Sequence, residues 1–118
     1  MSKTSEILTV ARALIADPDH WTKWSHARDN TGQGVPPLDP RAVCFCADGA
    51  LMRAAGTVSG QAYMDASLEM VHACRDLTGS GDYVTVNDGS ARYAGLLPHQ
   101  AILASFDRAI ERAKLLEA

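Results

Sequence analysis

Four stretches of the chain carry apolar residues three and four positions apart, which is the spacing of an amphipathic helix. These stretches cover residues 5–16, 40–55, 61–77 and 98 to near the C-terminus. Asp17-Pro18 ends the first stretch, because a proline disfavours helical geometry in the residue before it. Gly56 and Gly79 follow the second and third stretches, and glycine commonly terminates a helix. The pattern therefore predicts four main helices.

The stretch 40–55 has the clearest helix start and the smallest side chains. Asp39 is the expected N-cap, and Pro40 is the expected first helical residue. Small residues such as Ala47 and Ala50 would let a neighbouring helix or a ligand approach the backbone closely. We therefore predict that this is the central and most buried helix, with Ala47 and Ala50 out of solvent.

Two segments interrupt the helical pattern. Residues 24–38 are rich in glycine, proline, asparagine and aspartate, which indicates a long structured loop. Tyr83–Val86 is a β-like run, and a turn signal follows it. Because a single strand cannot form a sheet, this run either pairs with residues 24–35 as a minor hairpin or simply lies extended.

Composition favours close-packed helices. The chain has 118 residues, the length of one domain, and 47% of them are apolar whereas only 6% are aromatic. Alanine, the strongest helix former, is plentiful. We therefore predict a single all-α domain over residues 1–118. It would be a compact bundle of about four helices with a long loop after the first helix and at most a minor two-stranded hairpin.

Charge and targeting signals narrow the class of protein. The net charge is −3, whereas a domain that relies on phosphate contacts usually has a basic surplus, so we do not expect a nucleic-acid partner. The N-terminus lacks the apolar core of a signal peptide, and no apolar run has the length of a membrane span. Three cysteines form no secreted disulfide framework. We predict a cytoplasmic protein that has no membrane contact.

Short motifs are spread over most of the chain. They are Trp24, Ala27-Arg28-Asp29, Gly32, Gly34, Asp39-Pro40, Ala42-Val43, Cys46-Ala47-Asp48-Gly49-Ala50-Leu51, Asn87-Asp88, His99 and Phe106-Asp107-Arg108-Ala109-Ile110. Together they resemble an uncharacterised family of small bacterial and phage proteins, known only as a domain of unknown function. The resemblance implies a small, mostly helical cytoplasmic protein, and it implies no activity.

Two pairs of residues have the chemistry of metal ligands, Cys44 with Cys46 and His72 with Cys74. Residues two apart on a helix point about 200° away from each other, so neither pair can converge on one ion unless the helix unwinds. Structural zinc also prefers cysteines separated by two residues in a turn. We expect thiols that pack as small apolar groups, and we predict neither a metal nor another cofactor.

One set of residues has the composition of a thiol-based catalytic site, namely Cys46, His99 and either Asn87 or Asp88. His99 would lie on the inward side of the C-terminal helix. Against this interpretation, Cys46 would lie beyond the first turn of its helix, where the helix dipole no longer lowers a thiol pKa. The alternative is a core cysteine beside a histidine that hydrogen-bonds to a loop.

The long loop offers a binding site of a different kind. Trp24, Arg28 and Asp29 are close together in the sequence, and Trp and Arg are enriched where proteins contact partners. Asp88 joins this candidate set from a later motif. The alternative is that these side chains anchor the loop to the bundle. Asp48 is either exposed or, if it is buried, paired with Arg28.

Connectivity predicts that the polar candidates gather around the N-terminal half of helix 40–55. They are Arg28, Asp29, Asn87, Asp88 and His99. Such a cluster would be either a structural latch or a binding site. The leading hypothesis is a non-enzymatic protein that binds a protein partner, as an accessory factor of a phage or prophage. The alternative is a small hydrolase or transferase that uses Cys46 and His99. The sequence leaves the target, any small-molecule ligand and the oligomeric state open.

Overall fold

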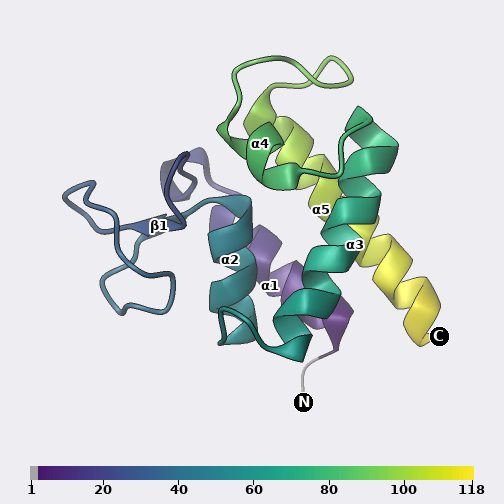
Figure 1. Ribbon diagram of the computed structural model, residues 1–118, viewed down its shortest axis with the longest axis horizontal. Coiled ribbons are helices and arrows are strands. Elements are labelled where there is room, and N and C mark those ends of the chain that lie inside the picture. The colour runs from purple at the N-terminus through teal and green to yellow at the C-terminus, as the bar shows by residue number, and fades with distance from the viewer. Residues whose placement is uncertain (1–2) are drawn as a thin grey trace.

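The computed structural model describes residues 3–118 as a mainly helical fold with one minor antiparallel strand pair (Figure 1). In chain order the elements are α1 (Thr4–Ile15), the short 3-10 helix η1 (Pro18–His20), β1 (Ala27–Arg28), β2 (Cys44–Phe45), α2 (Ala47–Ala55), α3 (Gln61–Thr78), α4 (Tyr83–Asp88) and α5 (Pro98–Glu117). The predicted fold class is confirmed. No helix among residues 3–118 is both long enough and apolar enough to cross a membrane.

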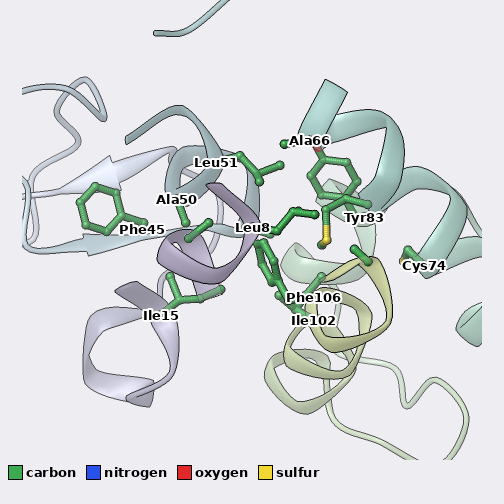
Figure 2. Packing of buried hydrophobic residues seen from close by; sticks show 14 of the residues in the cluster. Leu8, Ile15, Phe45, Ala50, Leu51, Ala66, Cys74, Tyr83, Ile102 and Phe106 are labelled. Atoms are coloured by element: carbon green, nitrogen blue, oxygen red, sulfur yellow. The ribbon is translucent and has the colours of Figure 1, made fainter. Parts of the chain in front are cut away.

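The helices pack around one apolar core. Helix α1 lies against both α2 and α5, and α3 lies along α5. Leu8, Leu51 and Phe106 come from three of these helices and meet in the core, where all three are fully buried (Figure 2). The loop-rich segment between α1 and α2 lies on one side of α2, and α3 and α5 lie on the other side (Figure 1).

Small residues bring α2 close to its neighbours, as the sequence predicts. Ala47 and Ala50 are fully buried, which confirms the expectation for this helix. Gly49 faces the preceding loop, and a Cβ atom at this position would collide with the backbone carbonyl of His26. The absence of a side chain at residue 49 therefore sets how closely the His26 segment approaches the start of α2.

The start of α2 differs from the prediction. Residues 40–46 are not helical, and Asp39 is not the N-cap, because its carboxylate accepts a 2.8 Å hydrogen bond from Arg41 N in a tight turn. Cys44 and Phe45 instead pair antiparallel with Arg28 and Ala27. The helix begins only after Cys46, whose Sγ accepts a 3.3 Å hydrogen bond from Gly49 N and acts as the N-cap.

The β-like run at residues 83–86 is the other correction. These residues form the first part of α4, so neither expected alternative occurs: they do not lie extended, and they do not pair with residues 24–35, because the partner of β1 is β2. Asp82 is the N-cap of α4 and accepts a 3.1 Å hydrogen bond from Thr85 N. Helical geometry places Tyr83 and Val86 on one buried face, which explains the apolar side chains without a strand.

The other helix predictions hold. Helices α1, α3 and α5 match the predicted stretches to within a residue or two. Gly56 and Gly79 both adopt the left-handed conformation directly after α2 and α3, with φ of 72° and 83°. Non-glycine residues seldom adopt this conformation, so the two glycines end their helices as expected.

Candidate functional site

The C-terminal end of α4 fastens the loop after α1 to the start of α2. The fully buried Asn87 side chain accepts hydrogen bonds from Trp21 Nε1 (2.7 Å) and Ala47 N (3.0 Å). Its Nδ2 atom donates to the Thr22 carbonyl and to Asp88 Oδ1, both at 3.0 Å. One amide thus satisfies groups from three segments, so it fixes where the loop begins relative to α2.

His99 supports the same loop from the start of α5. Its ring lies beside the Trp21 indole, with 4.9 Å between the ring centroids. Its Nε2 atom is 2.7 Å from the Ile15 carbonyl oxygen at the end of α1. These contacts explain His99 as a packing partner of Trp21 that also binds an otherwise unpaired helix carbonyl.

Trp24 is held in an unusual backbone conformation while its side chain faces solvent. Its φ is 62°, in the left-handed region, and the residue is 76% exposed. Its backbone N–H donates a 3.0 Å hydrogen bond to Asp88 Oδ1. A non-glycine residue in this region costs of order 1–3 kcal/mol and persists where the surroundings impose it. Here the surroundings present a large aromatic side chain to solvent.

A pocket of about 340 Å³ lies beside Trp24. Its walls come from the loop after η1, the start of α2 and helix α4. The lining residues are Trp24, Ser25, His26, Cys46, Val84 and Asp88. We call this site the Trp24 pocket.

A buried carboxylate lies behind the His26 wall of the Trp24 pocket. Asp48 Oδ1 accepts hydrogen bonds from the hydroxyls of Tyr63 (2.6 Å) and Tyr83 (2.9 Å). Its other oxygen, Oδ2, lies 3.3 Å from His26 Nε2. The first turn of α2 also stabilises a negative charge at residue 48. Asp48 therefore has a fixed orientation, and it in turn orients the imidazole of His26.

The same cluster changes the acidity of its tyrosines. Burial, together with the hydrogen bond to Asp48 and its charge, raises the pKa of Tyr63 to about 12. Burial is also the main reason that the pKa of Tyr83 lies well above its usual range, and the charge of Asp48 adds to this effect. Both hydroxyls therefore remain protonated near neutral pH and continue to donate to the carboxylate.

Arg28 does not pair with Asp48. Its guanidinium donates to Thr22 Oγ1 (2.9 Å), the Gly32 carbonyl (3.0 Å) and the Lys23 carbonyl (3.1 Å). The expected Arg28–Asp48 pair is thus replaced by three neutral oxygen acceptors on the loop itself. This geometry makes Arg28 a latch that holds the loop in shape.

Asp29 lies outside the Trp24 pocket lining and shapes the tip of its own loop. Its carboxylate accepts hydrogen bonds from the Thr31 hydroxyl, Thr31 N and Gln33 N. The bonds from Thr31 are the main reason that the Asp29 pKa is lowered. Of the five residues expected to cluster, Asn87 contacts the start of α2 directly. Three others contact the loop that precedes α2, namely Asp88, His99 and Arg28. Asp29 contacts only the tip of its own loop among the hydrogen bonds of residues 3–118.

Cys46 lies in the Trp24 pocket, but its thiol is not activated. Burial raises the pKa of Cys46 from 9.0 to about 11, and the negative charges of Asp48 and Asp88 add to this effect. A nucleophilic thiol needs the opposite shift. Asp88 lines the same pocket, whereas the ring nitrogen of His99 is bound to the Ile15 carbonyl. The geometry therefore disfavours a Cys46–His99 catalytic pair.

Sequence reasoning missed the partners of Asp48. The spacing of Tyr63 assigns it to the apolar face of its helix, and that of Tyr83 assigns it to a strand, so neither residue suggests a carboxylate partner. A usable signal exists, because a buried tyrosine hydroxyl usually needs a hydrogen-bond partner. No three His, Cys, Asp or Glu side chains within residues 3–118 converge in a way that could hold a metal ion.

Comparison with known proteins identifies a family without assigning a role. A model described as a family of unknown function (DUF6197) matches residues 1–112, and the chain belongs to this family. The curated proteins contain no significant match to the chain, and neither do the solved structures.

Proposed function

We propose that this member of the family is a non-enzymatic binding domain that recognises a protein partner through Trp24 and the Trp24 pocket. The observation that carries the proposal is the exposed indole of Trp24 on a left-handed backbone that Asp88 fixes. Tryptophan is enriched among the few residues that dominate binding energy, and a rigid aromatic anchor loses little conformational freedom on binding.

The surroundings of Trp24 support a binding role. Arg28 and Asn87 donate hydrogen bonds to the carbonyls of Lys23 and Thr22, the two residues before Trp24, so the indole is displayed by a preorganised segment. Lys23 packs near the indole, with its Nζ atom 5.7 Å from the ring centroid, and donates to the Gly89 carbonyl. A preorganised surface of this kind favours binding because less ordering is needed on association.

The proposal extends to the setting in which the protein acts. The motifs that resemble small phage and bacterial proteins support an accessory factor of a phage or prophage. The net charge of −3 and the three free cysteines are in keeping with a protein partner in a reducing cytoplasm. A reaction that uses Cys46 is the weaker candidate, because its thiol is buried and its pKa is raised.

The test compares two variants that each remove one exposed apolar side chain. Trp24→Ala alters the proposed site, whereas Leu115→Ala removes a 78% exposed side chain near the far end of α5. Each immobilised protein is incubated with a lysate of the cells that encode it, and retained proteins are quantified by mass spectrometry. We expect a partner that the wild type and Leu115→Ala retain and Trp24→Ala loses. Equal retention by Trp24→Ala would overturn the proposal.

A further inference from the structure

The polar groups that line the Trp24 pocket are mostly hydrogen-bond acceptors. Asp88 contributes a carboxylate, which has no hydrogen to donate. Its Oδ1 atom accepts from Trp24 N and Asn87 Nδ2. Its Oδ2 atom accepts no hydrogen bond from residues 3–118, so this oxygen remains available to a ligand that donates one.

His26 presents a second acceptor. The Asp48 carboxylate lies 3.3 Å from Nε2 and favours the ring form that carries its proton on this nitrogen. In the neutral imidazole the other nitrogen, Nδ1, then has a free lone pair. Asp48 cannot easily turn away, because Tyr63 and Tyr83 hold its other oxygen.

Ser25 and Cys46 fit the same pattern. The Ser25 hydroxyl donates its hydrogen to the Ala27 carbonyl, which leaves the oxygen lone pairs to accept. The sulfur of Cys46 accepts from Gly49 N and offers only a weak S–H donor. An occupant of the pocket must therefore supply the donors.

The charged side chains around the Trp24 pocket favour a cationic occupant. Asp88 and, behind His26, Asp48 are the two carboxylates at the pocket, and His26 is the one basic side chain among the lining residues. The indole of Trp24 already attracts a positive charge, since the Lys23 ammonium lies 5.7 Å from its ring centroid and 5.6 Å from that of the nearby Trp21. Lys23 is outside the pocket lining and is bound to the Gly89 carbonyl.

We propose, on the basis of the binding function above, that the Trp24 pocket takes an arginine side chain of the partner protein. A guanidinium supplies five donors in a plane, carries a permanent positive charge and stacks on an indole. A lysine ammonium matches the charge but neither the stacking nor the several acceptors. The volume of about 340 Å³ lies near the low end of ligand pockets, about 300–1,000 Å³, and suits a single side chain.

The experiment uses two short peptides that differ in one atom group. Acetyl-Gly-Arg-Gly-amide carries the guanidinium, and the citrulline version replaces it with a neutral urea of the same shape. Each is titrated into the isotope-labelled full chain while the indole signal of Trp24 is followed by NMR. We expect the arginine peptide to shift this signal with at least about tenfold tighter binding than the citrulline peptide. Equal binding of the two would overturn the inference.

Asp88→Asn supplies the matched variant. It removes the charge but keeps an oxygen that can accept from Trp24 N and Asn87 Nδ2. We expect it to weaken binding of the arginine peptide about tenfold, whereas Asp65→Asn, an equal charge change on the exposed face of α3, leaves binding unchanged. Undiminished binding to Asp88→Asn would contradict the inference. If Asp88→Asn does not fold, the comparison of the two peptides on the wild type still decides.

The two proposals fail in different ways. Partner retention that depends on Trp24, together with equal binding of both peptides, would remove the arginine inference and leave the binding function standing. Partner retention that survives Trp24→Ala would remove the binding function. It would do so even if the arginine peptide binds in the pocket.

Discussion

Asp88 Oδ1 accepts a 3.0 Å hydrogen bond from the backbone N–H of Trp24, a residue 64 positions earlier in the chain. The bond joins the last residue of α4 to the loop after α1 and holds Trp24 at a φ of 62°. The residue remains 76% exposed, so burial of apolar area does not compensate the backbone cost. This relationship links the loop geometry to the proposed binding role.

The positive φ of Trp24 predicts that a glycine variant at this position is more stable than an alanine variant, the reverse of the usual order. We expect Trp24→Gly to be more stable than Trp24→Ala by roughly 1 kcal/mol, because glycine adopts a positive φ without steric cost. Urea unfolding measures both free energies. At Gln33, an exposed loop residue without a positive φ, the alanine variant should instead be the more stable one. The same order at both positions would contradict the strain at Trp24.

Arg28→Ala tests the latch. The substitution leaves Thr22 Oγ1 and the carbonyls of Lys23 and Gly32 without their donor, and we expect the free energy of unfolding to fall by about 1–2 kcal/mol. Arg92→Ala is the control, because among residues 3–118 the Arg92 guanidinium makes a hydrogen bond only to the Gly95 carbonyl on an exposed loop. Partner retention should survive in the folded Arg28→Ala protein. Unchanged stability together with lost retention would make Arg28 a binding residue instead.

Alkaline pH should destabilise the fold. The pKa of Cys46 rises from 9.0 to about 11 and that of Tyr63 from 10.0 to about 12 on folding, so the unfolded chain loses these protons first. The unfolded state therefore binds fewer protons than the folded state, and stability decreases as pH rises. The stability that these two protonated groups contribute is fully present below about pH 9 and is lost progressively up to about pH 12.

The Tyr63→Phe variant isolates one of these groups. It removes the proton linkage of Tyr63, so its unfolding free energy should fall less steeply than that of the wild type between pH 10 and 12. Urea unfolding at a series of pH values gives both slopes. Stability that stays constant between pH 8 and 11 in the wild type would contradict the raised pKa values.

Thiol reactivity separates the binding function from catalysis. With a pKa of about 11 instead of 9.0, Cys46 has about a hundredfold lower thiolate fraction at pH 8 than an ordinary thiol. We expect iodoacetamide to modify Cys46 slowly in the native protein and readily in urea, with mass spectrometry locating the label. Rapid and selective modification of native Cys46 near pH 7 would favour the hydrolase or transferase alternative.

Local sequence patterns predict the long helices, but they do not predict whether a short segment forms a helix or pairs with a distant strand. The apolar spacing of α1, α3 and α5 continues over three or more turns, so the local pattern is enough to identify these helices. The Asp39-Pro40 start signal is equally clear, yet Asp39 bonds to Arg41 and the next residues pair with β1. Such pairing depends on a segment distant in sequence, which a local pattern does not include.

In the candidate site, too, some residues can be identified from the sequence, whereas others depend on contacts between distant segments. Residue type singles out Trp24, and its place in a motif singles out Asp88, as members of a binding set, and the structure places both in the Trp24 pocket. The environment of Asp48 depends on α3 and α4 meeting at the start of α2, so its tyrosine partners could not be found from spacing. Asp82, the residue before α4, is of a type that commonly caps a helix, and it accepts a hydrogen bond from Thr85 N. The β-branched residues that follow it favour a strand, so the two local signals disagree.

The most direct test of the proposed function is the affinity of one purified partner for the wild type and for Trp24→Ala, measured by calorimetry. The partner is a protein that the wild type and Leu115→Ala retain from the lysate. We predict that Trp24→Ala weakens its binding at least about 30-fold, equivalent to about 2 kcal/mol, the loss expected at the centre of an interface. An affinity for folded Trp24→Ala within about twofold of the wild-type value would contradict the account.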